Sequence, residues 1–237
     1  MNTLVLNSLG AVSTVGWLIA YVLIIWRSFK DKVFGMPVAA LAANLSWEAS
    51  YGFLYEPLSN DLHRDSIAWF FADVPIVVQC FMYGAKDFRA PFVKRHFKLI
   101  FVAAIGMALP LMRLAFEEFH DPKGLYTGFG INFMMSILFV AMLARRDGIA
   151  GQSVYIAIFK WIGTLFAYAY TVFEAITSAE HPWPSASFVQ DTVMHQTYPL
   201  TPTINFLYLF VFVLDVLYIV LVYRKAKECG VDPWRRA

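Results

Sequence analysis

Seven long apolar runs, separated by short polar connections, constrain what this chain of 237 residues can fold into. A helix needs about 20 consecutive apolar residues to cross the hydrocarbon core of a bilayer, where strand edges and loops would leave backbone groups unpaired. Because the hydrophobic fraction is 59% and charged residues are only 15%, a soluble domain is excluded. The sequence therefore predicts an all-α, polytopic membrane protein, a seven-transmembrane-helix bundle in one domain over 1–237, with spans near 9–29, 34–54, 66–84, 97–119, 124–144, 153–176 and 202–223.

Basic residues predict the orientation of this bundle. Of the 19 Lys and Arg residues, 15 lie after the first, third and fifth runs or in the C-terminal tail. The positive-inside rule then places the N-terminus outside and the C-terminus in the cytoplasm, which requires an odd number of spans. We expect a multi-pass protein of a bacterial inner membrane, or of the endoplasmic reticulum in a eukaryote. The bilayer is its expected partner, and nucleic acid is not, since aromatic and basic residues do not share a soluble face.

The second run carries polar residues at membrane depth, in the stretch Asn44-Leu-Ser-Trp47-Glu48-Ala-Ser-Tyr51. Asn44, Glu48 and Tyr51 follow each other at spacings of four and three, so they share one helical face. A charged side chain at the centre of a membrane helix costs about 3 kcal/mol on insertion scales. Glu48 is therefore predicted to have a buried partner or a function. The first run lacks such residues and is predicted to be scaffold.

A second intramembrane carboxyl group lies in the third run, where Trp69 precedes Asp73. With a rise of about 1.5 Å per residue, Glu48 lies about 9 Å and Asp73 about 11 Å below the outer helix ends. The two groups are thus expected to share a site. An alternative is a structural ion network of Glu48, Asp73 and Arg113, because buried charges usually pair.

The sixth and seventh runs carry a further polar stripe. Trp161 and Tyr168 lie on one face of the sixth run, and the seventh run contains Asp215 about 20 Å below its outer end. One interpretation is that Asp215 and Glu48 lie at opposite ends of an elongated pocket. The alternative is that Asp215 forms a structural salt bridge with Lys160. The residues on the face of Asp215 are Asn205, Tyr208, Phe212 and Tyr218.

The Asn44…Trp47-Glu48…Tyr51, Trp69…Asp73 and Asp215…Tyr218 motifs resemble the small seven-span integral membrane terpene cyclases. These enzymes act in fungal meroterpenoid and indole-diterpene pathways, and bacterial relatives cyclise farnesylated indoles. The resemblance implies a protonation-initiated, class II-like cyclisation of a farnesyl or geranylgeranyl chain, with or without an epoxide, attached to an indole or other head group. In that family a Glu of the second span and an Asp of the seventh are required acids, which match Glu48 and Asp215.

The chemistry of the residues agrees with this implication. A carboxylic acid in a dry cavity keeps its proton, because its charged form would lose its hydration, and it can then act as a general acid. Aromatic rings stabilise a carbocation and exclude water. The catalytic candidates are Glu48 and Asp215, and the substrate-binding candidates are Asn44, Trp47, Tyr51, Trp69, Asp73, Trp161, Tyr168, Asn205, Tyr208, Phe212 and Tyr218.

Missing motifs narrow the reaction class. The sequence has no Asp-Asp-x-x-Asp cluster for a magnesium-bound diphosphate, so we expect no diphosphate ionisation, metal, cofactor or redox change. Two other functions stay open, a small proton-coupled transporter that uses the intramembrane carboxyl groups and a retinal-binding receptor with Lys160 as the Schiff-base lysine. The connection 178–201 is either a lid or an inert loop, and its His181 and His195 are too few ligands for a metal site.

Overall fold

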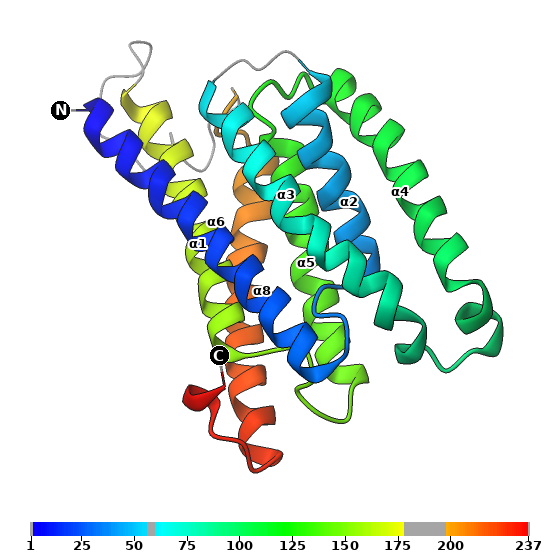
Figure 1. Cartoon of the computed structure of the whole chain (residues 1–237). Helices are drawn as coiled ribbons and strands as arrows, with labels where there is room; N and C mark the ends of the chain where they lie inside the picture. Colours follow the sequence, from blue (N-terminus) through cyan, green and yellow to red (C-terminus); the bar gives the residue numbers. More distant parts are fainter. Residues whose placement is uncertain (1, 56–59, 178–197, 237) are drawn as a thin grey trace.

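A computed structural model of the chain describes residues 2–55, 60–177 and 198–236, and all regular structure within these ranges is helical (Figure 1). The long helices alternate in direction, so that the start of α1 and the C-terminal tail lie at opposite ends of the bundle (Figure 1). The helices are α1 (Asn2–Asp31), α2 (Val38–Ala49), the π-helix η1 (Ser50–Leu54), α3 (Asn60–Tyr83), the 3₁₀-helix η2 (Gly84–Asp87), α4 (Pro91–Phe119), α5 (Leu125–Arg145), α6 (Val154–Thr177), α8 (Pro202–Glu228) and the 3₁₀-helix η3 (Pro233–Arg235).

Six of the described helices are long and apolar enough to cross a membrane, which confirms a polytopic membrane protein. The helix of the second predicted span is shorter than expected from 34–54. Pro37 has an extended backbone, with ψ of 135°, so α2 begins only at Val38 and has 12 residues. It continues directly into the 5 residues of the π-helix η1. Single-turn π-helices occur frequently at functional sites.

The other helices extend beyond their apolar runs. α3 begins at Asn60 rather than near 66, and α4 begins at Pro91 rather than near 97. Helical hydrogen bonding continues into the interfacial region, where polar side chains are hydrated, so hydropathy alone underestimates helix length. Proline suits the first turn of α4, because its missing N–H would have no partner there.

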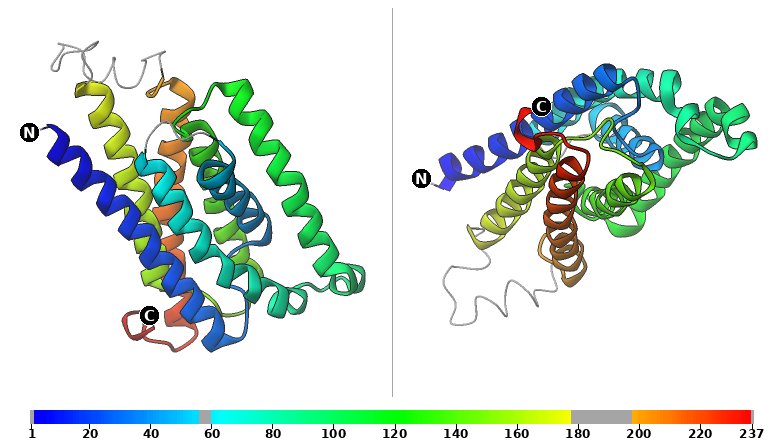
Figure 2. Two further views of the ribbon diagram at one scale, coloured as in Figure 1. Left: turned by 45° about the horizontal axis from the view of Figure 1, so that its top comes forward. Right: turned by 90° about the horizontal axis from the view of Figure 1, so that it is seen from below.

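Close packing between α1 and α6 brings the first run into the centre of the bundle. A Cβ atom on Gly16 would lie 3.0 Å from the backbone nitrogen of Gly163, so the two helices approach closely because both positions are glycine. α8 packs along α5, and α2 packs between α3 and α4. α4 lies at the edge of the bundle in both views of Figure 2. The interior is therefore enclosed mainly by α1, α2, α3, α5 and α6.

Candidate active site

A cavity of about 100 Å³ lies in this interior. Most of its walls are apolar or aromatic, and its polar groups come from α1, α2 and α5. Apolar walls with a few converging polar groups are typical of small-molecule sites, but such sites usually have volumes of about 300–1,000 Å³, so this cavity has room for only a part of a larger ligand. The lining residues are Ser13, Trp17, Tyr21, Asn44, Trp47, Glu48, Trp69, Gly128, Phe129, Ile131, Asn132 and Ala167.

Glu48 is held at the cavity by Tyr21 and Asn44. Its side chain is buried, and the Tyr21 hydroxyl donates to Glu48 Oε1 over 2.8 Å. Asn44 Nδ2 lies 2.7 Å from the same oxygen, 2.8 Å from the Tyr21 hydroxyl oxygen and 3.0 Å from Asp73 Oδ2. Because an amide nitrogen carries only two hydrogens, Asn44 serves two of these three acceptors at one time. Asn44 thus links Glu48 and Asp73, as their similar depth predicts.

Glu48 and Asp73 form a pair of carboxyl groups without a counter-ion. Glu48 Oε2 and Asp73 Oδ1 are buried, and neither accepts a hydrogen bond from any other described residue. Neither carboxyl group forms an ion pair with any basic side chain of residues 2–55, 60–177 or 198–236. Two carboxylates so close together in a buried site would repel each other strongly if both were charged. The cavity therefore has beside it two acidic groups that no basic side chain neutralises.

The predicted alternative of an ion network with Arg113 is wrong. Arg113 is more than half exposed and pairs with Glu117, one turn further along α4. Its guanidinium also lies 5.3 Å from the centre of the Tyr55 ring. Counting residues placed Arg113 at the depth of Asp73, but the helical phase of α4 directs it to the surface.

The tryptophans of α2 and α3 form one wall of the cavity. The Trp47 and Trp69 rings lie 6.3 Å apart. Trp47 Nε1 donates to Thr127 Oγ1 over 2.9 Å, which fixes its orientation. Gly124 makes room for this ring, since a Cβ atom there would lie 2.7 Å from Trp47 Cζ2. Both tryptophans belong to the predicted site residues.

The prediction that the first run is scaffold is wrong for Ser13, Trp17 and Tyr21, which line the cavity. The Trp17 and Tyr21 rings lie 5.8 Å apart. Each is a single aromatic residue in an apolar run, and such residues usually pack in a core. The Tyr21 hydroxyl could have indicated from the sequence that this run faces the interior, because a polar group at mid-span requires a hydrogen-bond partner.

Asp215 lies in a separate network, as the salt-bridge alternative predicts. Lys160 Nζ lies 2.6 Å and 2.8 Å from its two carboxylate oxygens, and both side chains are buried. The Ser136 hydroxyl lies 2.7 Å from Asp215 Oδ1 and 2.8 Å from Lys160 Nζ. Lys160 Nζ is also 5.8 Å from the centre of the Trp17 ring. Trp17 and Tyr21 therefore connect the Lys160–Asp215 pair with the Glu48 cluster.

An aromatic cluster from α6 and α8 adjoins the cavity through Phe129. The Tyr168 hydroxyl donates to Asn205 Oδ1 over 2.7 Å, and its ring is stacked on Tyr208 with 3.6 Å between the ring centres. Phe129, a cavity residue, meets both tyrosines edge-on at 6.2 and 6.0 Å. Three of the predicted site residues are thus close to the cavity without lining it.

The remaining predicted residues do not line the cavity either, although the Tyr51 ring packs on the cavity residue Trp47 with 4.7 Å between the ring centres. Trp161 and Phe212 form a pair with ring centres 5.8 Å apart. Tyr51 and Tyr218 act as ties between segments, since their hydroxyls donate to the Asp121 carbonyl and to Gln152 Oε1. The connection considered as a lid lies outside the described residues from 178 to 197, including His181 and His195.

Comparison with known proteins gives the same family as the sequence motifs. Residues 2–226 match the family model of Pyr4-like transmembrane terpene cyclases. The Pyr4-family terpene cyclase mfmH of Annulohypoxylon moriforme is 32% identical over 64% of this chain and 63% of its own length. The terpene cyclase andB of Emericella variicolor is 27% identical over 68% and 69%. The terpene cyclase ascF of Acremonium egyptiacum is 26% identical over 94% and 82%.

These findings confirm the predicted resemblance, and they support the predicted enzyme class, a cyclase, and its location as a multi-pass integral membrane protein. The match covers all the long helices that surround the cavity and nearly the whole of α8. The chain belongs to the family of Pyr4-like transmembrane terpene cyclases.

Proposed function

We propose that the protein cyclises a farnesyl or geranylgeranyl chain that is attached to an indole or other head group, and that Glu48 starts the reaction by donating a proton. The observation that carries this proposal is the buried pair of carboxyl groups, Glu48 and Asp73, linked by Asn44 beside an aromatic cavity. Membership of a terpene cyclase family supports the reaction class.

The protons and electrons of this reaction balance without a cofactor. The Glu48 carboxyl group gives its proton to the terminal alkene carbon, or to the oxygen of a terminal epoxide, and a carbocation forms. Internal alkenes of the chain then supply the electron pairs for ring closure. Loss of a proton from carbon ends the reaction, so the product has the mass of the substrate. Asp73 and Asn44 position the Glu48 carboxyl group, and the pair takes up a proton again before the next turnover.

The cavity walls suit a carbocation. Trp17, Trp47, Trp69 and Phe129 present ring faces or edges to this space. Aromatic faces attract cations by about 0.5–2 kcal/mol each and carry no nucleophilic oxygen that would trap one. Enclosure by rings also keeps bulk water from ending the reaction early.

The size of the cavity limits which part of the substrate it holds. An engineered apolar cavity of about 150 Å³ takes up benzene, which has six carbons. The cavity beside Glu48, at about 100 Å³, is thus matched to the five carbons of a terminal isoprene unit. We place this unit at Glu48 and the rest of the chain along the neighbouring Tyr168–Tyr208 cluster, which requires side chains to move apart.

Asp215 takes the second role in this proposal. Its carboxylate is neutralised by Lys160, so it is not the group that begins the cycle with a transferable proton. We assign to the pair the stabilisation of positive charge at a later stage of ring closure, or the acceptance of the final proton. The Trp17 ring lies 5.8 Å from Lys160 Nζ and 5.8 Å from the Tyr21 ring, so it lies between the Lys160–Asp215 pair and the Glu48 cluster.

For the membrane topology we propose seven spans, with α2 and η1 as the short second span, the N-terminus outside and the C-terminus in the cytoplasm. The ends of α1, α3, α5 and α8 carry the basic residues, and they lie at one end of the bundle. Bilayers thin locally around short helices at a modest cost, so 17 helical residues suffice for a span enclosed by others.

The experiment compares membranes that contain wild-type protein, Glu48→Gln, Asp215→Asn and the matched control Glu117→Gln. Glu117 is half exposed, pairs with Arg113 and lies outside the cavity lining. Each preparation receives farnesylated indole or its terminal epoxide, and products are followed by mass spectrometry and retention time. Other prenylated aromatic head groups form a second panel.

The proposal expects a product of unchanged mass and new retention time from wild type and Glu117→Gln, and none from Glu48→Gln. In D₂O an alkene substrate gains one deuterium on carbon, whereas a deuteron added to an epoxide oxygen exchanges away. Full turnover by Asp215→Asn contradicts the second role of Asp215. Absence of product from well-folded wild type on every prenylated substrate contradicts the proposed reaction.

A further inference from the structure

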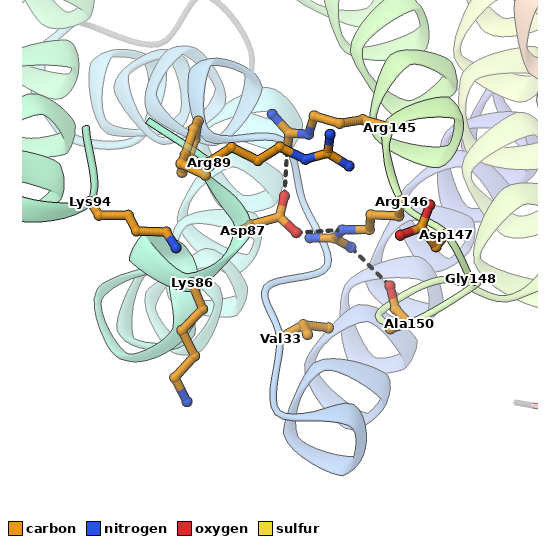
Figure 3. Close-up of a pocket in the computed structure, with 11 residues that line it drawn as sticks. Val33, Lys86, Asp87, Arg89, Lys94, Arg145, Arg146, Asp147, Gly148 and Ala150 are labelled. Atoms are coloured by element: carbon orange, nitrogen blue, oxygen red, sulfur yellow. Dashed lines mark hydrogen bonds and ion pairs between the residues drawn. The ribbon is translucent and has the colours of Figure 1, made fainter. Parts of the chain in front are cut away.

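A second pocket, of about 720 Å³, opens at the end of the bundle where α1, α3 and α5 finish and α4 begins (Figure 3). It shares no lining residue with the cavity beside Glu48. Its lining is strongly basic, with a net formal charge of +3 from Lys86, Arg89, Lys94, Arg145 and Arg146 against Asp87 and Asp147.

Arg146 builds the floor of this pocket. It is only 8% exposed, and its guanidinium donates to Asp87 Oδ1, to the Ala150 carbonyl and to the Phe34 carbonyl over 2.8–3.0 Å. It also lies 4.8 Å from the centre of the Phe34 ring. One buried side chain therefore holds together three connections, those after α1, α3 and α5. The pocket is a built feature of the fold rather than a chance gap between loops.

Three basic side chains at the rim have no acidic partner. In Figure 3 dashed lines join Asp87 to Arg145 and Arg146, but none reaches Lys86, Arg89 or Lys94. Arg89 and Lys94 are exposed and make no side-chain hydrogen bond or ion pair within the described ranges. Anion binding would therefore not have to displace an existing acidic partner of these side chains.

The start of α4 adds to the positive potential of the pocket. α4 begins at Pro91, Ala90 before it provides no side-chain cap, and Lys94 lies in the first turn. The N-terminus of a helix carries about half a positive charge and free N–H groups, which favours phosphate oxygens. The basic side chains and the helix end thus favour the same kind of ligand, a phosphate group.

The position of the pocket indicates a lipid as the source of that phosphate. The ends of membrane-spanning helices lie at the headgroup level of the bilayer. α4, which forms one wall, exposes Phe92, Leu99 and Val102 by 70%, 67% and 54%. Such side chains face hydrocarbon in a membrane, so acyl chains can lie along α4 while a headgroup reaches the pocket.

We propose that this pocket binds the phosphate of an anionic phospholipid, with Arg89 and Lys94 as the main contacts and Arg145 and Lys86 beside them. The proposal concerns a site apart from the cyclisation cavity and does not depend on the proposed reaction. Basic pockets at the membrane interface of this kind bind anionic headgroups in preference to zwitterionic ones.

The test uses the purified full chain in detergent micelles, with bound lipid counted by native mass spectrometry. Wild type is titrated with dioleoylphosphatidylglycerol, with dioleoylphosphatidylcholine and with inorganic pyrophosphate as the soluble source. The pocket variant is Arg89→Gln with Lys94→Gln. Its matched control is Arg224→Gln with Lys225→Gln, which removes the same charge at the same end of the bundle but outside the pocket.

Wild type and the control pair are expected to bind the anionic lipid at least about tenfold more tightly than the zwitterionic lipid, and the pocket variant is expected to lose about tenfold. Circular dichroism checks that each variant keeps its helix content, which is expected because none of the substituted side chains is buried. An equal loss in the control pair overturns the proposal, because the effect is then general surface charge. Equal binding of both lipids, or pyrophosphate binding that the anionic lipid does not displace, also overturns it.

Discussion

The buried Lys160–Asp215 pair makes the sharpest prediction about stability. Its ammonium group lies 2.6 and 2.8 Å from the carboxylate oxygens, and the two side chains are 2% and 1% exposed. Lys160→Met leaves Asp215 with only the Ser136 hydroxyl as a partner in the described chain. An uncompensated charge at this depth costs about 3–5 kcal/mol of unfolding free energy, which is at least about a hundredfold in the equilibrium constant.

Changing both partners is expected to restore most of the stability. In Lys160→Met with Asp215→Leu neither charge is desolvated, and apolar side chains of similar size fill the space, so the unfolding free energy returns to within about 1 kcal/mol of wild type or exceeds it. Lys123→Met provides the matched control, because its 2.7 Å pair with Glu174 is 42% and 29% exposed. That loss is expected to be about 0–1 kcal/mol.

The assay is unfolding in mixed micelles with increasing dodecyl sulfate, followed by circular dichroism of the helices. A loss in Lys160→Met as small as in Lys123→Met would refute the reasoning, since the pair would then be effectively solvated. A double variant that loses as much as the single variant would refute it as well, because the cost would then come from packing and not from an unpaired charge.

Three further changes test other parts of the structure. In Gly163→Ala the new Cβ atom would lie 2.6 Å from Trp17 Cδ1, so the indole shifts in the cavity wall and we expect a cyclisation rate lower by about tenfold or more in the product assay. Tyr198→Phe removes the hydrogen bond that the hydroxyl donates to Asp121 and the one that it accepts from the Lys123 N–H, and it is expected to cost about 1–2 kcal/mol at neutral pH. Burial and the nearby Asp121 carboxylate raise the pKa of Tyr198 in the folded protein. Above about pH 10 the phenol therefore ionises first in the unfolded chain, which lowers the unfolding free energy of wild type. The difference in unfolding free energy between wild type and Tyr198→Phe then becomes smaller. Arg146→Gln leaves Asp87 with Arg145 as its partner and leaves the Phe34 and Ala150 carbonyls without the guanidinium donor, and we expect a loss of about 3 kcal/mol in micelle unfolding.

For each of these three variants, one result would contradict the expectation. An unchanged rate in Gly163→Ala would show that the Trp17 position does not matter to the reaction. A gap for Tyr198→Phe that widens above pH 10 would contradict the sign of the pKa shift. A loss below about 1 kcal/mol in Arg146→Gln would show that the three connections hold together without its hydrogen bonds.

Much of the fold follows from hydropathy and charge. Apolar runs predict where the long helices lie, and the glutamate at membrane depth with Asn44 one turn before it predicts a polar cluster. Counting residues along the second and third runs also predicts that Glu48 and Asp73 share a site, and the Asn44 amide joins them. Depth along a helix axis can be counted from sequence because the rise per residue is constant.

The rotation of one helix against another could not be predicted in the same way. Arg113 has the depth of Asp73 but points to the surface of α4, whereas Trp17 and Tyr21 point inward from a run without a polar face. Their inward orientation follows from the contact of Gly16 with Gly163, which sets how α1 lies on α6. A small-residue contact between two helices is a property of the pair, and a single sequence does not indicate which two glycines will meet.

The most direct test of the account is the rate at which Glu48→Gln cyclises the substrate that wild type converts, measured beside Glu117→Gln. Gln keeps the size of the side chain and its place beside Tyr21 and Asn44 but cannot donate an acidic proton. Loss of a general acid typically lowers a rate by about 10²–10⁴-fold. We expect a loss of this size in Glu48→Gln with helix content unchanged, and a wild-type rate in Glu117→Gln. A Glu48→Gln protein that turns over as fast as wild type would contradict it.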